Sequence, residues 1–321
     1  MRREKARSRQ KKNSMYEAYW SLKEKPFENT PDPRFFYYSA EHREAVARML
    51  YVVREHKGAA LFTGEYGCGK TLLTRVLWQE LQQEHRYQPV FILNPRLSGL
   101  EFIQEIVHQL EGVSASQTKI ELFHTLHKLL YTNHNAGKHS VIIIDEAQAI
   151  QNLDIFEEVR LLLNFQLDNA FLLTIILLGQ PELKYTVMSL PQFMQRMAVK
   201  FHLKAFNEQE TREYIQHRIS VGGSARRIFD DEALHEIFIA SAGVPRRINT
   251  ICDLALLVGF GNGLAAIDKK TIVQINDDLG SPDFDMRYMK SSQSKQGAGL
   301  PDGAGPFGIP HAPPSGGADN V

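Results

Sequence analysis

Eight consecutive residues in the first third of the chain have the types and spacing of a phosphate-binding loop. They run Gly64-Glu65-Tyr66-Gly67-Cys68-Gly69-Lys70-Thr71 and fit the pattern G-x-x-x-x-G-K-[ST]. Glycines let the backbone curl until its N–H groups point at phosphate oxygens, and a following helix offers its positive end. We therefore expect the stretch through Leu72 to hold the phosphates of a nucleotide, with Lys70 reaching the β- and γ-phosphates and Thr71 binding Mg²⁺.

An acidic pair follows an apolar run further along the chain. Val141-Ile142-Ile143-Ile144 is wholly β-branched and predicts a buried parallel strand, which ends at Asp145-Glu146. Because ligands bind at the carboxyl ends of such strands, we expect Asp145 to hold the Mg²⁺ shell. Glu146 is suited to polarise an attacking water. An acidic strand end alone is weak support, but paired with the phosphate loop it is strong.

Alternating helices and strands must position these two segments. Strands are predicted at five short apolar runs, which are residues 59–63, 90–93, 141–144, 172–178 and 199–203. Helical spacing occurs between them, around residues 46–53, 73–81, 100–110 and 120–130. This alternation predicts a five-stranded parallel sheet with right-handed crossovers. The extra strand before the acidic run favours phosphate-loop ATPases that use a catalytic glutamate over simple nucleoside kinases.

After the fifth strand the pattern becomes wholly helical. Asn207 with Glu210 has the spacing of a capping box, and Asp231 is predicted to cap a second helix. Pro245 is expected to begin a third helix, and Asp268 a fourth. These helices predict a small all-helical lid domain behind the α/β core.

The third helix of this predicted lid begins with two arginines. Arg246 and Arg247 fall in its first turn, where cations oppose the helix dipole at a cost of roughly 0.3–1 kcal/mol each. A phosphate ligand would explain this placement, and simple surface arginines are the alternative. We expect Arg246 to contribute to nucleotide binding.

Composition is compatible with a nucleotide-dependent enzyme or switch. The 321 residues are 43% hydrophobic, enough for one sizeable core and a smaller domain. The formal net charge is zero, so no global field favours nucleic acid. Two cysteines, Cys68 and Cys252, indicate a reducing compartment. Apolar runs such as residues 175–178 are far shorter than the roughly 20 residues of a membrane span, and no signal peptide is evident. We expect a cytoplasmic protein.

The chain divides into four predicted parts. Residues 1–14 form a basic tail expected to be disordered, and a true start at Met15 is an equally good interpretation. Residues 15–205 are the nucleotide-binding α/β domain and residues 206–280 the helical lid. Residues 281–321 are rich in Gly, Pro and Ser and are expected to be flexible.

The order of these motifs resembles the ExeA/GspA-type AAA+ ATPases of secretion, pilus and exopolysaccharide-export loci in Gram-negative bacteria. The resemblance extends over about residues 15–279. Its blocks are residues 27–35, 39–43, 64–71, 145–148, 178–183, 195–196 and 243–249. It implies ATP and Mg²⁺ as cofactors, ATP hydrolysis, a homo-oligomer, and partners in an inner-membrane secretion or export complex.

The same resemblance implies roles for three further polar residues. Gln180, at the end of the fourth strand, matches the position that senses the γ-phosphate. Arg196 matches the arginine finger presented to the ATP of a neighbouring subunit, and Arg246 matches a second sensor. The alternatives are a polar strand-exit residue for Gln180 and a surface arginine for Arg196.

Weaker assignments concern residues around the nucleotide. Asn94 is a candidate partner that restrains Glu146, and Phe27 and Tyr38 are candidates to border adenine, although aromatic residues here are more often core. His124 and His127 share a predicted helix face, but no further ligand accompanies them for a metal.

Two function hypotheses remain open. The first is an ATPase that drives or times assembly of a secretion or polysaccharide-export complex; the second is an ATP-gated DNA-binding regulator, as in transposition. The basic residues 2–12 favour the second slightly, and the neutral net charge counts against it. A GTP switch is disfavoured because no Asn-Lys-x-Asp run follows the acidic strand. Family members often continue into a transmembrane helix and a peptidoglycan-binding domain, which this sequence does not lead us to expect.

Overall fold

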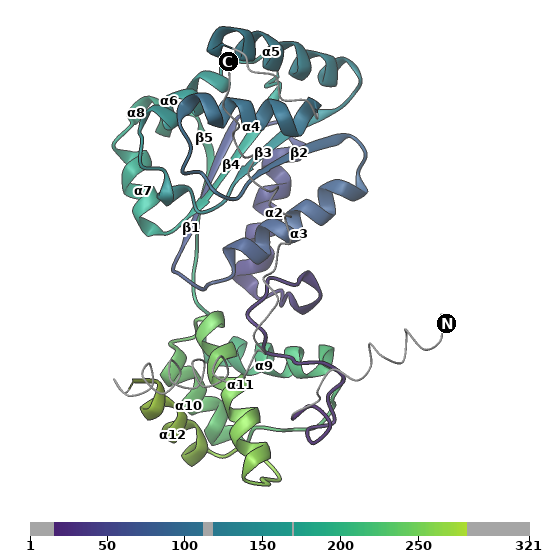
Figure 1. Ribbon diagram of the computed structural model, residues 1–321, viewed down its shortest axis with the longest axis vertical. Coiled ribbons are helices and arrows are strands. Elements are labelled where there is room, and N and C mark those ends of the chain that lie inside the picture. The colour runs from purple at the N-terminus through teal and green to yellow at the C-terminus, as the bar shows by residue number, and fades with distance from the viewer. Residues whose placement is uncertain (1–15, 112–117, 169, 281–321) are drawn as a thin grey trace, which may run out of the picture. The chain divides into compact units, whose positions relative to one another are not determined.

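The computed structural model describes residues 16–111, 118–168 and 170–280 (Figure 1). The chain divides into two units between residues 276 and 277, and the described residues up to Asn276 form one compact unit. Of the second unit only the last turn of the final helix is described. The predicted basic tail and the predicted C-terminal tail lie outside the described residues. Within the described ranges, no helix combines the length and apolarity that crossing a membrane requires.

Five strands form one parallel sheet in the order β2-β3-β4-β1-β5, which confirms the predicted sheet. Their bounds are β1 (Ala59–Gly64), β2 (Tyr87–Ile92), β3 (His139–Ile144), β4 (Leu173–Gly179) and β5 (Met197–Leu203). The phosphate loop follows β1, the acidic pair follows β3, and Gln180 follows β4. Because parallel strands end at one edge of a sheet, all three segments lie on the same edge.

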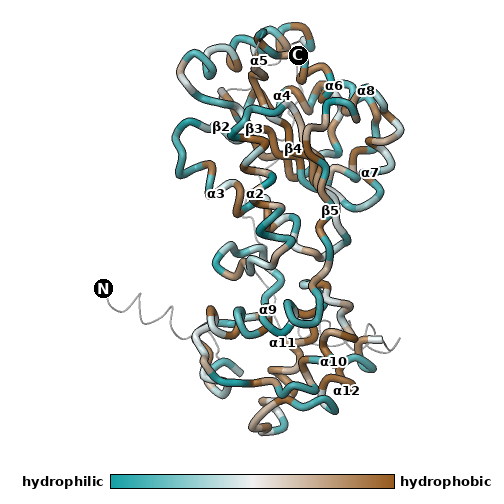
Figure 2. Tube along the Cα trace, turned by 180° about the vertical axis from the view of Figure 1, so that it is seen from behind, coloured by the Kyte–Doolittle hydropathy of each residue, from teal (hydrophilic) through white to brown (hydrophobic). Residues whose placement is uncertain are grey.

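Helices cover both faces of the sheet (Figure 1). Their bounds are α2 (Ala40–Arg54), α3 (Lys70–Gln83), α4 (Gly99–Glu111), α5 (Lys119–Asn135), α6 (Asp154–Leu162), α7 (Pro181–Met188) and α8 (Pro191–Met194). Alternate strand residues face opposite ways: Leu61 and Ile144 pack with α4 to α8, whereas Phe62 and Ile143 pack with α2 and α3. Every residue of β3 and β4 is buried, as expected for a parallel sheet covered on both sides, and Figure 2 shows these strands as an apolar centre.

Four helices follow β5. Their bounds are α9 (Glu208–Val221), α10 (Asp231–Ser241), α11 (Pro245–Gly261) and α12 (Lys269–Gly280). The predicted capping box is present, since Asn207 Oδ1 accepts from the Glu210 N–H at 2.9 Å and the Glu210 carboxylate accepts from the Asn207 N–H at 3.1 Å. Pro245 is the first residue of α11, as predicted. At α12, Asp268 Oδ1 accepts from the Thr271 N–H at 2.9 Å.

The predicted cap of α10 was wrong by one residue. Asp230 is the cap, because its backbone is extended and its carboxylate accepts from the Ala233 N–H at 2.7 Å. Asp231 is already helical and pairs with Arg227 at 2.5 Å. Two adjacent aspartates offer the same capping chemistry, so sequence spacing did not separate them.

Burial of His139 at the start of β3 predicts acid-sensitive stability. Its Nε2 lies 2.9 Å from Thr174 Oγ1, and its ring stacks on His56 with centroids 4.0 Å apart. Desolvation, followed by the charges of His56 and His134, lowers the pKa of His139 from 6.5 to about 3. Between these values the unfolded chain binds a proton that the folded chain does not, so the stability conferred by neutral His139 is lost as pH falls.

We expect His139→Gln to reduce the loss of unfolding free energy between pH 7 and pH 5 by about 2 kcal/mol. Urea unfolding at both pH values measures this loss. His124→Gln is the matched control, because His124 is exposed. An unchanged pH dependence in His139→Gln would show that His139 is not the group responsible.

Candidate nucleotide-binding site

The predicted phosphate loop connects β1 to the first residue of α3. Gly67 and Gly69 adopt φ values of 85° and 94°, which side-chain-bearing residues rarely adopt. A Cβ added at Gly67 would lie 2.9 Å from Arg246 Cβ, so this glycine also admits α11 close to the loop. Gly69 is the N-cap of α3, and the loop therefore meets the positive end of a helix.

His42 of α2 contacts the backbone of this loop, and the sequence analysis assigned it no role at the site. Its Nε2 lies 3.1 Å from the carbonyl oxygen of Cys68, and its Nδ1 lies 2.8 Å from Ser39 Oγ. Burial lowers the pKa of His42, which favours the neutral ring. The neutral tautomer that fits these contacts donates from Nε2 to Cys68 and accepts at Nδ1 from the serine hydroxyl.

The side chain of Lys70 is buried and folds back against the loop that precedes α3. Its ammonium donates to the carbonyl oxygens of Gly64 at 2.7 Å and Glu65 at 2.9 Å. Desolvation lowers its pKa, and the nearby charge of Glu146 opposes that effect. The ammonium thus lies between the loop and the acidic pair, where it can bind the oxygens of a phosphate.

Thr71 and Asp145 are in contact and have the donor chemistry of a magnesium site. Asp145 is 1% exposed, and its backbone N–H donates to the carbonyl oxygen of Ile92 on β2 at 3.0 Å. Burial raises the pKa of its carboxyl group, while the hydrogen bond from Thr71 lowers it. A hydroxyl and a carboxylate together suit Mg²⁺, which keeps several waters and takes few protein ligands.

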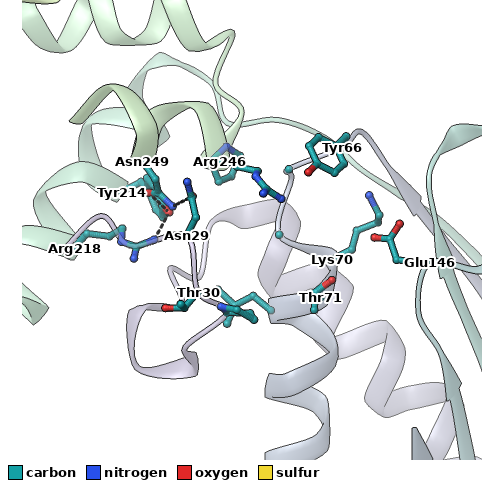
Figure 3. A pocket seen from close by; sticks show the side chains of 15 residues that line it. Asn29, Thr30, Tyr66, Lys70, Thr71, Glu146, Tyr214, Arg218, Arg246 and Asn249 are labelled. Atoms are coloured by element: carbon teal, nitrogen blue, oxygen red, sulfur yellow. Dashed lines mark hydrogen bonds between the residues drawn. The ribbon is translucent and has the colours of Figure 1, made fainter. Parts of the chain in front are cut away.

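Glu146 lies beside them in an unusual backbone conformation. Its φ of 51° and ψ of 36° are left-handed, which costs a non-glycine residue on the order of 1–3 kcal/mol and is concentrated at functional sites. Its N–H donates to Asp145 Oδ1 at 2.9 Å, and its carboxylate accepts from Gln148 Nε2 at 2.5 Å. The turn directs the carboxylate toward the phosphate loop (Figure 3).

A cavity of about 280 Å³ joins these residues to the helices that follow β5. Lys70, Thr71, Glu146 and Tyr66 line one end, and Arg246 lies between the two ends (Figure 3). The other end is lined by Asn29, Thr30, Pro31, Tyr214, Arg218 and Asn249. The cavity therefore has a phosphate-loop end and a second polar end with an aromatic side chain.

Arg246 connects α11 directly to the phosphate loop. Its backbone N–H donates to the carbonyl oxygen of Gly67 at 3.2 Å, and its guanidinium lies 4.9 Å from the centre of the Tyr66 ring. Arg247 donates instead to the carbonyl oxygen of Ala240 on α10 at 2.6 Å. Of the two arginines noted in the sequence, Arg246 is the one that lines the cavity.

A partly buried hydrogen-bond chain forms the second end of the cavity, and sequence reasoning did not assign its members to the site. The Arg218 guanidinium donates to the hydroxyl of Tyr214 at 2.8 Å and to the carbonyl oxygen of Glu28 at 3.0 Å. Tyr214 donates to Asn249 Oδ1 at 2.9 Å, and Asn249 donates to Asn29 Oδ1 at 3.1 Å. The chain fixes the segment around Asn29 against α9 and α11.

The aromatic candidates for adenine contact do not line this cavity. Phe27 is 1% exposed and packs edge-on against Phe229, and Tyr38 packs edge-on against Phe36. Block 27–35 of the sequence did mark the correct segment, but its contribution to the cavity comes from residues 29–31. Phe27 therefore belongs to the core, whereas Tyr38 is 46% exposed.

Asn94 is not the hydrogen-bond partner of Glu146. Its Oδ1 accepts from the Arg96 N–H at 3.3 Å within its own loop, whereas Gln148 donates to the Glu146 carboxylate. Gln148 is two residues after the glutamate, in the 3-10 turn η2 (Ala147–Ala149). The turn brings the two side chains into contact, and the sequence pattern did not predict this contact.

Gln180 and Arg196 lie outside the residues that line the cavity. The backbone N–H of Gln180 donates to Gln148 Oε1 at 3.0 Å at the start of α7. Arg196 follows α8, is partly exposed, and donates to Asn164 Oδ1 at 3.3 Å. Their sensor and finger roles stay predictions. No set of three or more metal-ligating side chains occurs within residues 16–111, 118–168 and 170–280, so His124 and His127 carry no metal argument.

The fold and site define an α/β protein of the AAA+ class, and residues 53–187 match the family described as "AAA domain". That domain implies nucleotide binding. More particularly, the chain belongs to the family of general secretion pathway protein A: it is 36% identical to that protein of Aeromonas hydrophila over 252 residues. The match covers 78% of this chain and 46% of the relative, so the chain spans about half the relative's length. The predicted family is confirmed.

Solved structures agree on the fold. The Aeropyrum pernix ORC2 protein superposes with a TM-score of 0.58 at 17% identity, covering 80% of this chain and 72% of that one. Thermotoga maritima RuvB superposes with a TM-score of 0.54 at 18% identity, covering 82% and 78%. Drosophila ORC bound to DNA gives 0.57 at 18% identity, covering 81% and 63%. At such identities the likeness concerns the fold alone.

Proposed function

We propose that this chain is an ATPase that binds ATP with Mg²⁺ in the cavity at the phosphate loop and hydrolyses it to ADP and phosphate. One observation carries the proposal: Lys70, Thr71 and Glu146 line one end of the same cavity, and Asp145 contacts Thr71 there. These residues come from the ends of β1 and β3, as the active-site edge of a parallel sheet requires.

Each residue then has a chemical task. Lys70 binds the β- and γ-phosphate oxygens through its ammonium. Thr71 and Asp145 would hold Mg²⁺, which neutralises charge on the phosphates when bound. Glu146 takes a proton from the attacking water, and its left-handed turn and its bond from Gln148 fix the carboxylate.

The remaining assignments complete an oligomeric mechanism. We propose that the α/β part and the helices after β5 act as core and lid. Arg246 would contact the nucleotide and so couple its binding to the position of α11. Gln180 and Arg196 would act on the γ-phosphate, Arg196 from a neighbouring subunit of a homo-oligomer. Arg196 is partly exposed on the short connection between α8 and β5, which is compatible with presentation to a neighbour.

The biological setting is proposed from the family. The relative is named for general secretion, and we propose that nucleotide state in this chain drives or times assembly of a bacterial secretion or polysaccharide-export complex at the inner membrane from the cytoplasmic side. Because the match spans less than half of that protein, the client complex is part of the proposal and not a property read from the relative.

Lys70→Ala tests nucleotide binding. We expect ATP affinity to fall at least tenfold, since the variant lacks the cation that pairs with the phosphate oxygens. Titration with a fluorescent ATP analogue measures affinity. Lys200→Ala, on β5 outside the cavity, is the matched control and should bind as wild type does. Equal affinity in Lys70→Ala would contradict the assigned phosphate site.

The alternative hypothesis, a DNA-binding regulator, can be tested in an ATP turnover assay. The basic residues 2–12, on which the DNA hypothesis rests, lie outside the described residues. Duplex DNA titrated at moderate salt should leave ATP turnover unchanged under the secretion proposal. Stimulation that declines steeply with added salt would support the DNA-binding regulator instead.

A further inference from the structure

Gln148 bridges two segments at the active-site edge of the sheet. Its Nε2 donates to Glu146 Oε2 at 2.5 Å, and its Oε1 accepts from the backbone N–H of Gln180 at 3.0 Å. One amide thereby joins the candidate base after β3 to the first residue after β4.

Both neighbours fix the orientation of this amide. A flipped amide would place its oxygen against the Glu146 carboxylate and its NH₂ group against the Gln180 N–H, which is unfavourable at both ends. Gly179 makes room for the amide, since a Cβ there would lie 2.7 Å from Gln148 Oε1. The side chain has donor and acceptor in the order that the two segments require.

We propose that Gln148 is a positioning residue for Glu146, holding the carboxylate at the cavity through an amide that is itself anchored on the backbone at the start of α7. The inference deepens the proposed ATPase and rests on it. By occupying Oε2, the amide leaves the other carboxylate oxygen to accept a proton from water. Because a small displacement of a base lowers its efficiency greatly, loss of the anchor should slow chemistry more than binding.

Two substitutions separate the two bonds. Gln148→Leu has similar size and makes neither hydrogen bond. Gln148→Glu keeps an acceptor for the Gln180 N–H but cannot donate to Glu146 when ionised. We expect both variants to lower kcat by about 10- to 100-fold while the Kd for ATP changes less than about twofold. Gln83→Leu, exposed at the end of α3, is the matched control and should keep wild-type kcat.

The measurement is steady-state phosphate release, with thermal melting and ATP titration on each variant. Wild-type kcat in Gln148→Glu, or a fall in ATP affinity equal to the fall in kcat, would overturn the positioning role. Should Gln148→Leu fail to fold, Gln148→Glu alone decides. If wild type itself releases no phosphate above a Glu146→Gln blank, the ATPase proposal fails, and that result differs from an active wild type with a silent Gln148 substitution.

Discussion

ATP turnover is expected to fall by about 10³–10⁵-fold in Arg196→Ala, with nucleotide affinity of the single subunit unchanged. The reason is geometric. Arg196 is partly exposed, bonds to Asn164, and is not among the residues that line the cavity of its own chain. A guanidinium that stabilises transition-state charge from this position must act on the cavity of a neighbouring subunit. Phosphate release and ATP titration, measured on the same preparation, separate the two effects.

Mixing two inactive variants gives a sharper result. Chains with Arg196→Ala keep Glu146, and chains with Glu146→Gln keep Arg196. Where the first presents its cavity to the arginine of the second, one site is complete, so the mixture should recover part of the wild-type turnover. Arg48→Ala, at an exposed arginine of α2 outside the cavity, is the control and should be active alone. A mixture as inactive as its components would contradict action across a subunit boundary.

Glu146→Gln should lower kcat by about 10²–10⁴-fold while ATP still binds. Glutamine keeps the shape of glutamate but cannot accept a proton from water, and the phosphate loop, Thr71 and Asp145 are untouched. Rapid-quench turnover and nucleotide titration measure the two quantities. Glu55→Gln is the matched control, because Glu55 is exposed at the end of α2 and does not line the cavity. Wild-type kcat in Glu146→Gln would assign the base elsewhere.

Local patterns in the sequence predicted most of the helices and strands. The apolar runs at residues 141–144 and 172–178 correspond to β3 and β4, because strands buried on both faces read as continuous apolar segments. The capping box at Asn207 likewise combines two hydrogen bonds in four residues. The N-cap of α10 is Asp230 and not the predicted Asp231. Sequence patterns could not separate these two residues, because they have the same side chain and differ only in backbone conformation.

The site was less accessible to sequence reasoning where it depends on distant contacts. Asn29 reaches the cavity because Arg218 and Asn249, about 200 residues further on, hold its segment. The bond from Gln148 to Glu146 depends on a left-handed turn that no spacing rule reveals. Residue types within a motif were therefore predictable, while partners contributed by separate elements required the folded chain.

The most direct measurement of the central claim is phosphate release from ATP and Mg²⁺ by the purified chain, with Glu146→Gln as the blank and protein concentration as the variable. The account predicts turnover above the blank, with specific activity that rises with concentration as subunits associate and Arg196 meets a neighbouring cavity. Phosphate release indistinguishable from the blank at every concentration would contradict it.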